Sequence, residues 1–140
     1  LTAFLVRRSV SCSEWIRTQL FSQNRSGIMS ILNSVKTAIG LEPDYTEFDD
    51  DIIMHINSAF SILSRLGVGP KEGFRIVDDS ADWSSFYTDP RLDGVKTYVA
   101  MRVRSIFDPP TTSFAINANV EVMKELEFTL QMGQEEVDAE

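Results

Sequence analysis

Hydrophobic residues recur at helical spacing in four stretches of this chain. In residues 30–40 they are three or four apart, Ser30 is a candidate N-cap, and Gly40 follows the last of them. The clearest stretch extends to Leu66 and is stopped by the Gly-Val-Gly-Pro sequence of residues 67–70. Both stretches indicate amphipathic helices. The apolar face of the second consists of Ile52, Ile56, Ala59, Phe60, Leu63 and Leu66.

The start of the second helix is marked by a capping signal and by acids. Thr46 stands three residues before Asp49, which is an approximate capping box. Acidic residues also fill the first turn, where the helix dipole favours negative charge. We therefore expect Thr46 to cap a helix that begins at about Asp49.

Two more helices are predicted in the second half of the chain. The third has its apolar face on Leu92, Val95, Val99 and Ile106. It must end at Phe107 or Asp108, because Pro109 disfavours helical geometry in the residue before it. Threonines 111 and 112 and Ser113 are candidate caps for the fourth helix. The face of that helix consists of Ile116, Val120, Met123, Leu126 or Glu127, and Leu130.

Residues 71–90 lack this periodicity and predict a long structured loop between the second and third helices. The fold class is therefore all-α, a small protomer of four helices. We divide the chain into an N-terminal extension of residues 1–28, a helical domain of residues 29–132 and an acidic tail of residues 133–140. We expect the tail to be disordered in isolation, because it carries one apolar residue among many acids.

The N-terminal 28 residues differ in kind from the rest of the chain. They carry four arginines against one glutamate and show no core-like periodicity after the first few positions. The chain opens on Leu, and the codons of residues 25–27 can spell a purine-rich ribosome-binding sequence just before Met29. A mitochondrial transit peptide has a similar composition. We favour the hypothesis that Met29 is the first residue of the natural protein and that residues 1–28 are a non-native or disordered extension.

Charge and composition narrow the function. The 140 residues carry a net charge of −8, which divides into +3 for residues 1–28 and −11 for the rest. A body this acidic repels phosphate over a Debye length of about 8 Å, so tight non-specific binding to DNA or to an anionic membrane is disfavoured. No apolar run approaches the length that spans a bilayer. One cysteine and one histidine cannot supply a disulfide or a structural zinc site.

Motifs for catalysis are sparse. Asp51 and His55 share one helix face at i, i+4, but two ligands do not make a metal site, and acids are expected at a helix start. Cys12 has no partner that argues for a nucleophile. The glycines of residues 67–70 follow a helix instead of opening one, so they do not form a phosphate loop. We expect no enzyme, no metal and no cofactor.

Aromatic and basic side chains offer candidate contacts. Trp83, Phe86 and Tyr87 could anchor an interface or close the open end of the helix bundle, and we favour the second interpretation. Arg102 and Arg104 could pair with the acids of a neighbour or form a solvated face, and exposed ion pairs contribute little.

Three stretches together resemble a known family. They are residues 51–60 running into 66–70, residues 95–99 running into 104–110, and residues 124–127. The Ile-Met-His-Ile-Asn run and the Phe-Asp-Pro-Pro turn are the most specific parts. The chain from about Ser30 to Leu130 resembles the head-to-tail adaptor, or connector, proteins of long-tailed double-stranded DNA phages and prophages.

The resemblance implies a virion protein at the neck, at the portal vertex of the capsid, assembled in the host cytoplasm. It implies a roughly twelve-fold ring between the portal protein and the stopper (head-closure) or tail-terminator protein, through which DNA passes without specific binding. The C-terminal helix and tail are then expected to dock on the portal through Val120, Met123, Leu126, Leu130 and Val137. A cyclic ring needs heterologous contacts. Candidates for these are Phe74, Ile76, Trp83, Phe86, Tyr87, Arg102 and Arg104.

Two alternatives stay open. An acidic protein of this size could mimic DNA and occupy a nucleic-acid-binding partner, although its acids cluster at residues 44–51 and in the tail instead of forming a regular stripe. A small metal-dependent hydrolase would depend on Asp51 and His55 alone, and it would lose divalent-metal binding in His55→Ala. We rank the hydrolase last.

Overall fold

A computed structural model describes residues 29–140 of the chain. Within this range there are four α-helices, two short 3-10 helices and no strands, so the predicted all-α class is confirmed. The α-helices are α3 (Ile31–Ala38), α4 (Asp49–Arg65), α5 (Gly94–Phe107) and α6 (Ser113–Asp138). The 3-10 helices η1 (Trp83–Ser85) and η2 (Pro90–Leu92) lie in and after the predicted loop. The expectations for residues 1–28, Cys12 included, lie outside the described residues.

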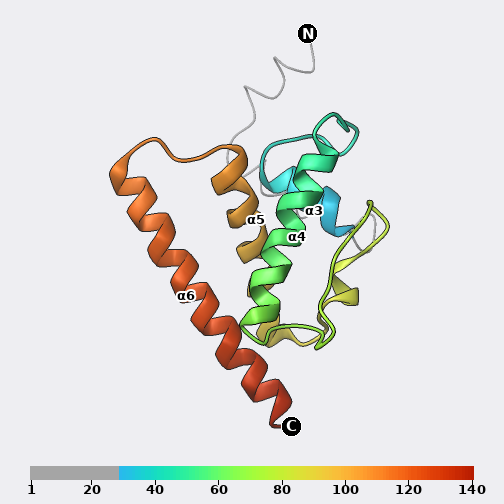
Figure 1. The fold of residues 1–140 in the computed structure, drawn as a ribbon, viewed down its shortest axis with the longest axis vertical. Helices are drawn as coiled ribbons and strands as arrows, with labels where there is room; N and C mark the ends of the chain where they lie inside the picture. Colours follow the sequence, from blue (N-terminus) through green and yellow to red (C-terminus); the bar gives the residue numbers. More distant parts are fainter. Residues whose placement is uncertain (1–28) are drawn as a thin grey trace.

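Helix α4 provides the largest apolar face of the core. It packs along α5, and α3 contacts both of them (Figure 1). The apolar face predicted for α4 is buried at Ile52, Ile56, Phe60 and Leu63. Burying a large aliphatic or aromatic side chain contributes about 1.5–3 kcal/mol, so this face is a main source of stability. The other buried helix positions are Ile31, Leu32 and Val35 of α3 and Val95, Tyr98, Val99 and Val103 of α5.

Caps and turns fix most of the helix ends as predicted. The Ser30 hydroxyl accepts the Asn33 N–H at 3.2 Å, and the Thr112 hydroxyl accepts the Ala115 N–H at 3.2 Å. Helix α5 ends at Phe107, ahead of the two prolines. Gly40 follows α3 with a φ of +90°, a conformation that L side chains rarely adopt.

The predicted cap of α4 is wrong. Phe48 occupies the N-cap position and makes no side-chain hydrogen bond to the helix, whereas Asp49 lies 2.7 Å from the buried Nζ of Lys36. Lys36 is fully buried, and its Nζ also donates to the Pro43 carbonyl at 2.9 Å. A buried ammonium requires a carboxylate and a carbonyl around it. That requirement, invisible in the local sequence, takes Asp49 away from the capping box.

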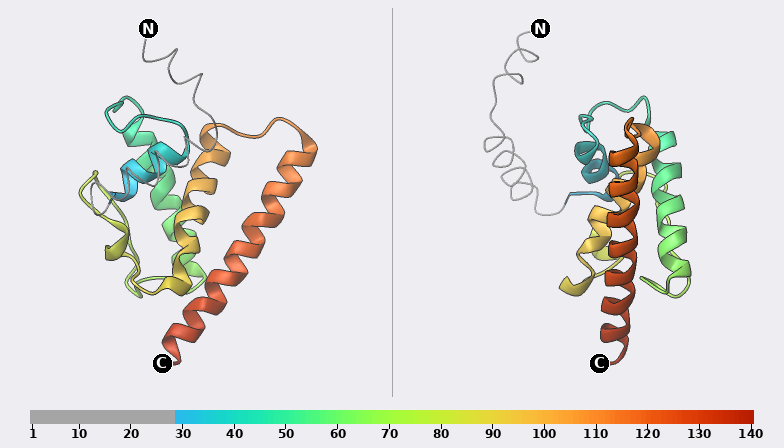
Figure 2. Two further views of the ribbon diagram at one scale, coloured as in Figure 1. Left: turned by 180° about the vertical axis from the view of Figure 1, so that it is seen from behind. Right: turned by 90° about the vertical axis from the view of Figure 1, so that its left-hand side faces the viewer.

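Helix α6 is longer than predicted. Its predicted apolar face runs to Leu130, and residues 133–140 are expected to form a tail that is disordered in isolation, but the helix continues to Asp138. Contacts from distant segments hold the extra turns: the Gly69 N–H donates to Gln134 Oε1 at 3.1 Å, and Arg91 forms an ion pair with Glu140 at 2.8 Å. Figure 2 shows α6 crossing the outside of the body as a single rod. At 1.5 Å per residue, its 26 residues span about 39 Å.

Candidate interaction surfaces

The predicted loop is packed against α4. Trp83 and Phe86 are buried, as the favoured core interpretation expects. Of the residues expected between subunits, Ile76 is also buried and Phe74 is partly buried. The ring of Phe60 on α4 lies 5.0 Å from that of Phe74 and 4.8 Å from that of Phe86. These aromatic residues hold the loop to the body.

One polar residue fixes the path of the loop. Asn57 of α4 donates from Nδ2 to the Ile76 carbonyl at 2.9 Å and accepts the Ile76 N–H on Oδ1 at 2.8 Å. Its amide therefore satisfies both backbone groups of Ile76, as a neighbouring strand would. Asn57 is the last residue of the Ile-Met-His-Ile-Asn run, and the resemblance implies no role for it. A signal existed: it is a polar residue next to Ile56, on the apolar side of an amphipathic helix.

Tyr87 and the two arginines are the loop and α5 candidates that reach the surface. The Tyr87 hydroxyl donates to Asp93 Oδ1 at 2.9 Å, and burial together with this bond raises the pKa of Tyr87. Arg102 is half-buried and Arg104 is exposed, both on α5. Among residues 29–140, neither arginine forms an ion pair with a carboxylate.

Helix α6 divides into two parts, which we call the cleft half (residues 113–122) and the packed half (residues 123–138). In the packed half, Met123 is 8% exposed and Leu130 is 1% exposed, and Leu126 packs against the same core. Gly133 lets the helix approach η2 so closely that an added Cβ would lie 3.0 Å from the Arg91 carbonyl oxygen. Of the candidates for docking, Met123 and Leu130 thus support their own protomer, whereas Val137 is half-buried.

The cleft half leaves apolar side chains exposed. Ile116 and Val120 are each 45% exposed, Val122 is 41% exposed and Phe114 is 85% exposed. Opposite them, Ile106 of α5 is 49% exposed. The pattern of hydrophobic positions predicts burial for Ile106, Ile116 and Val120, and the protomer buries none of them. All three line one open pocket between α5 and α6, the helices that diverge towards the connecting turn in Figure 1.

The divergence creates an open cleft with two sides. One side has a volume of about 640 Å³ and is lined by Arg104, Asp108 and Val122 among others. The other has a volume of about 610 Å³ and is lined by Ile106, Ile116 and Val120 among others. The two prolines of the turn, Pro109 and Pro110, line both sides. We call this feature the α5–α6 cleft.

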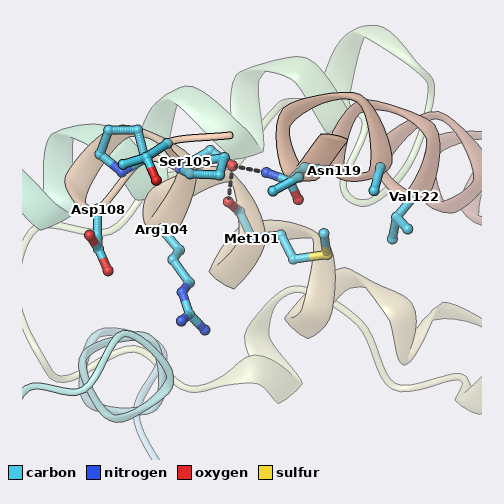
Figure 3. A pocket seen from close by; sticks show the side chains of 11 residues that line it. Met101, Arg104, Ser105, Asp108, Asn119 and Val122 are labelled. Atoms are coloured by element: carbon cyan, nitrogen blue, oxygen red, sulfur yellow. Dashed lines mark hydrogen bonds between the residues drawn. The ribbon is translucent and has the colours of Figure 1, made fainter. Parts of the chain in front are cut away.

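One hydrogen-bonded chain bridges the two helices within the cleft. Asn119 Nδ2 donates to Ser105 Oγ at 2.7 Å, and that hydroxyl donates to the Met101 carbonyl at 2.7 Å. Figure 3 shows this chain, with Arg104 and Asp108 extending from α5 away from Asn119. Further down, the Tyr98 hydroxyl donates to Glu127 at 2.8 Å, and burial and this bond raise the pKa of Tyr98. These two contacts join α5 and α6, one within the cleft and one below it.

A second surface is the acidic segment between α3 and α4, residues 42–51, which we call the acidic turn. It carries six carboxylates and two exposed aromatic rings, Tyr45 at 42% and Phe48 at 36%. Lys36 fixes it from below, and the ring of Phe48 lies 5.4 Å from that of Phe107. The turn is a rigid, acidic projection with an apolar centre.

The candidates for metal chemistry stay apart. Asp51 and His55 lie one turn apart on α4, and nowhere in residues 29–140 do three His, Cys, Asp or Glu side chains gather as a metal ion would require. In the same range, no helix combines the length and the hydrophobicity that crossing a membrane requires.

Comparison with known proteins gives one family. Residues 31–137 match the family described as phage connector protein. The match begins at the first residue of α3 and ends one residue before the end of α6, so it covers all four helices. No curated protein and no solved structure matches the chain.

Proposed function

Because this chain belongs to the phage connector protein family, we propose that it is the adaptor subunit that forms a ring between the portal and the stopper or tail-terminator protein. Members of such a family have a structural role at the phage neck and contact other head and tail proteins. In the proposed role, roughly twelve copies surround the path of the DNA. The ring extends the channel of the portal towards the tail.

The observation that carries this proposal is the exposed apolar surface of α6. The cleft half presents Phe114, Ile116, Val120 and Val122 to solvent in a protomer whose core is otherwise filled. Exposed apolar side chains gathered on one short helical segment are typical of surfaces that bind another protein. An assembly subunit needs such a surface, because its neighbours complete the burial.

Charge supports passage of DNA without binding. The chain from residue 29 onward has a net charge of −11, so a ring of many copies is strongly acidic. Phosphates gain no counterion release from such a surface. DNA would therefore slide through the ring without adhering to it.

We place the portal contact on α6. Val120 is exposed, Leu126 and Val137 are half-buried, and Phe128 and Met132 add exposed apolar area at 66% and 42%. In this proposal Met123 and Leu130 do not touch the portal. They are buried and hold α6 against its own protomer. In the same way, Phe74, Ile76, Trp83 and Phe86 would act between subunits only by fixing the loop, and Tyr87, Arg102 and Arg104 would make the direct contacts.

Native mass spectrometry of the full chain tests the proposal, alone and mixed with the portal protein encoded by the same genome. We expect a closed oligomer of about twelve subunits or a defined complex with the portal. The variant Phe128→Asp should weaken the portal complex, and Met54→Asp, at an exposed position on α4, serves as its matched control. A monomer under both conditions would contradict the ring and favour an acidic DNA mimic.

A further inference from the structure

The α5–α6 cleft is apolar inside and basic at its edges. Arg102 and Lys124 border the side that contains Ile116 and Val120, and Arg104 borders the side that contains Val122. Two carboxylates also line the cleft. Glu127 accepts a hydrogen bond from Tyr98, and Asp108 is exposed at the end of α5. Its occupant should therefore be apolar at the centre and acidic around it.

The acidic turn has this chemistry on the same chain. Its two exposed rings, Tyr45 and Phe48, are surrounded by carboxylates, of which Asp50 and Asp51 are exposed at the start of α4. Aromatic side chains, Tyr above all, are typical of the anchors that fill a pocket on a partner. Lys36 holds the turn in place, so little conformational entropy would be lost on binding.

The positions of the two surfaces suit a ring. In Figure 1 the acidic turn and the turn that connects α5 with α6, which borders the cleft, lie at the same end of the molecule on opposite sides. Two different surfaces on opposite sides make a heterologous contact, which closes into a ring when successive copies are related by rotation alone. For a ring axis along the long dimension of the molecule, surfaces at the same height need no rise from one copy to the next.

We propose that the acidic turn of one copy binds in the α5–α6 cleft of the next, on the side lined by Arg104, Ala118 and Val122, with Tyr45 and Phe48 against the apolar lining of that side and the carboxylates facing Arg104. The proposal deepens the ring assembly above and depends on it. It assigns an occupant to the cleft, namely a second copy of this chain. It also gives the acids at the start of α4 a function beyond the helix dipole.

Site-directed cross-linking of the full chain, alone and with the portal, tests the contact. In a Cys12→Ser background, one variant carries Asp44→Cys in the turn and a second carries Ala118→Cys, a cleft-lining position. With a short bifunctional maleimide, each variant alone should give no cross-link between copies, and their mixture should give dimers only. The chain with both cysteines should give a ladder up to the ring size. Replacing Asp44→Cys by Met54→Cys, outside both surfaces, should abolish the ladder.

The failures of the two proposals can be told apart. If native mass spectrometry shows a ring but the double-cysteine chain gives no ladder, the contact is overturned and the adaptor function stands. Cross-linking of Ala118→Cys to the portal alone would assign the cleft to the portal and also overturn the contact. If no oligomer or portal complex forms at all, both proposals fall.

Charge reversal provides a second test. Arg104→Glu should weaken self-association at least tenfold, and combining it with Asp50→Lys in the same chain should restore at least half of that loss on a logarithmic scale. Arg75→Glu, in the exposed loop away from both surfaces, is the matched control. A combined variant that associates no better than Arg104→Glu alone would count against pairing between these surfaces.

Discussion

The two halves of α6 differ in what their apolar side chains contact. The packed half buries Met123 and Leu130 in its own protomer, and Gly133 brings the helix against η2. The cleft half exposes its apolar residues, and Asn119 joins it to α5 through a single side-chain hydrogen bond. One continuous helix thus buries its apolar side chains in the protomer core along one part and leaves them exposed along the other. Its hydrophobic pattern alone does not distinguish the two parts.

Truncating one apolar side chain to Ala in each half should give the largest difference in the free energy of unfolding. Leu130→Ala removes a side chain that is 1% exposed, and we expect it to lower the free energy of unfolding by about 2–5 kcal/mol. Val120→Ala, in the cleft half, should change that free energy by about 0.5 kcal/mol or less. Denaturant unfolding of the dilute protein, followed by circular dichroism, measures both. Equal losses would show that the cleft half is also part of the folding core.

Adding a methyl group at Gly133 tests how closely the packed half approaches η2. Gly133→Ala places a Cβ 3.0 Å from the Arg91 carbonyl oxygen, a backbone atom that cannot easily move. We expect a loss of about 1–3 kcal/mol from this overpacking, partly offset by the better helix propensity of Ala. In the control Gly94→Ala, the nearest atom to the new Cβ is a Leu130 methyl at 3.4 Å, which is ordinary contact. The same thermal unfolding midpoint for both variants would disprove the close contact as a constraint.

Removing the bridge of the cleft half should have a local effect. Asn119→Ala deletes the hydrogen bond to Ser105, which is worth about 0.5–1.5 kcal/mol at most at this half-buried site. We expect faster amide hydrogen exchange in residues 113–122 and unchanged exchange in the packed half. Asn117→Ala, an exposed asparagine of the same half, is the matched control. If both variants exchange alike, the bridge does not position the cleft half.

The sequence predicts the fold wherever local signals decide it. The periodicity of α4, the caps Ser30 and Thr112, and the stop before Pro109 are all local, and the structure confirms them. The errors depend on long-range partners. Asp49 leaves its expected capping role for Lys36, and the expected tail becomes helix through contacts with distant segments. The residues next to Asp49 and next to the tail do not reveal such distant partners.

The candidate surfaces were predicted less well, for a related reason. Periodicity indicates that a residue is buried against something, but not whether the partner is its own protomer. Ile106, Ile116 and Val120 fit the pattern of a core and are exposed, so the exceptions to the pattern gather at the α5–α6 cleft. Conversely, Trp83 and Phe86, weighed as interface anchors, fill the core. Only the folded protomer separates these two classes.

The smallest expected effect is a local loss of stability at the C-terminal end of the packed half at low pH. Arg91 donates to Asp89 and Glu140, and these hydrogen bonds lower the pKa of Asp89 to about 2 and lower that of Glu140 as well. Because a folded-state pKa below the unfolded value of about 3.9 stabilises the folded state above that pH, this contribution disappears as the pH falls from about 4 to about 2.

Amide protection factors of residues 134–139, measured by NMR across that pH range, should therefore decrease on acidification, while those of residues 113–122 stay constant. Arg91→Gln should lower the protection at neutral pH and remove its dependence on acid. Protection that falls equally in both halves would mean that acid acts on the whole fold. The Arg91 contacts would then not be what separates the end of the packed half from the cleft half.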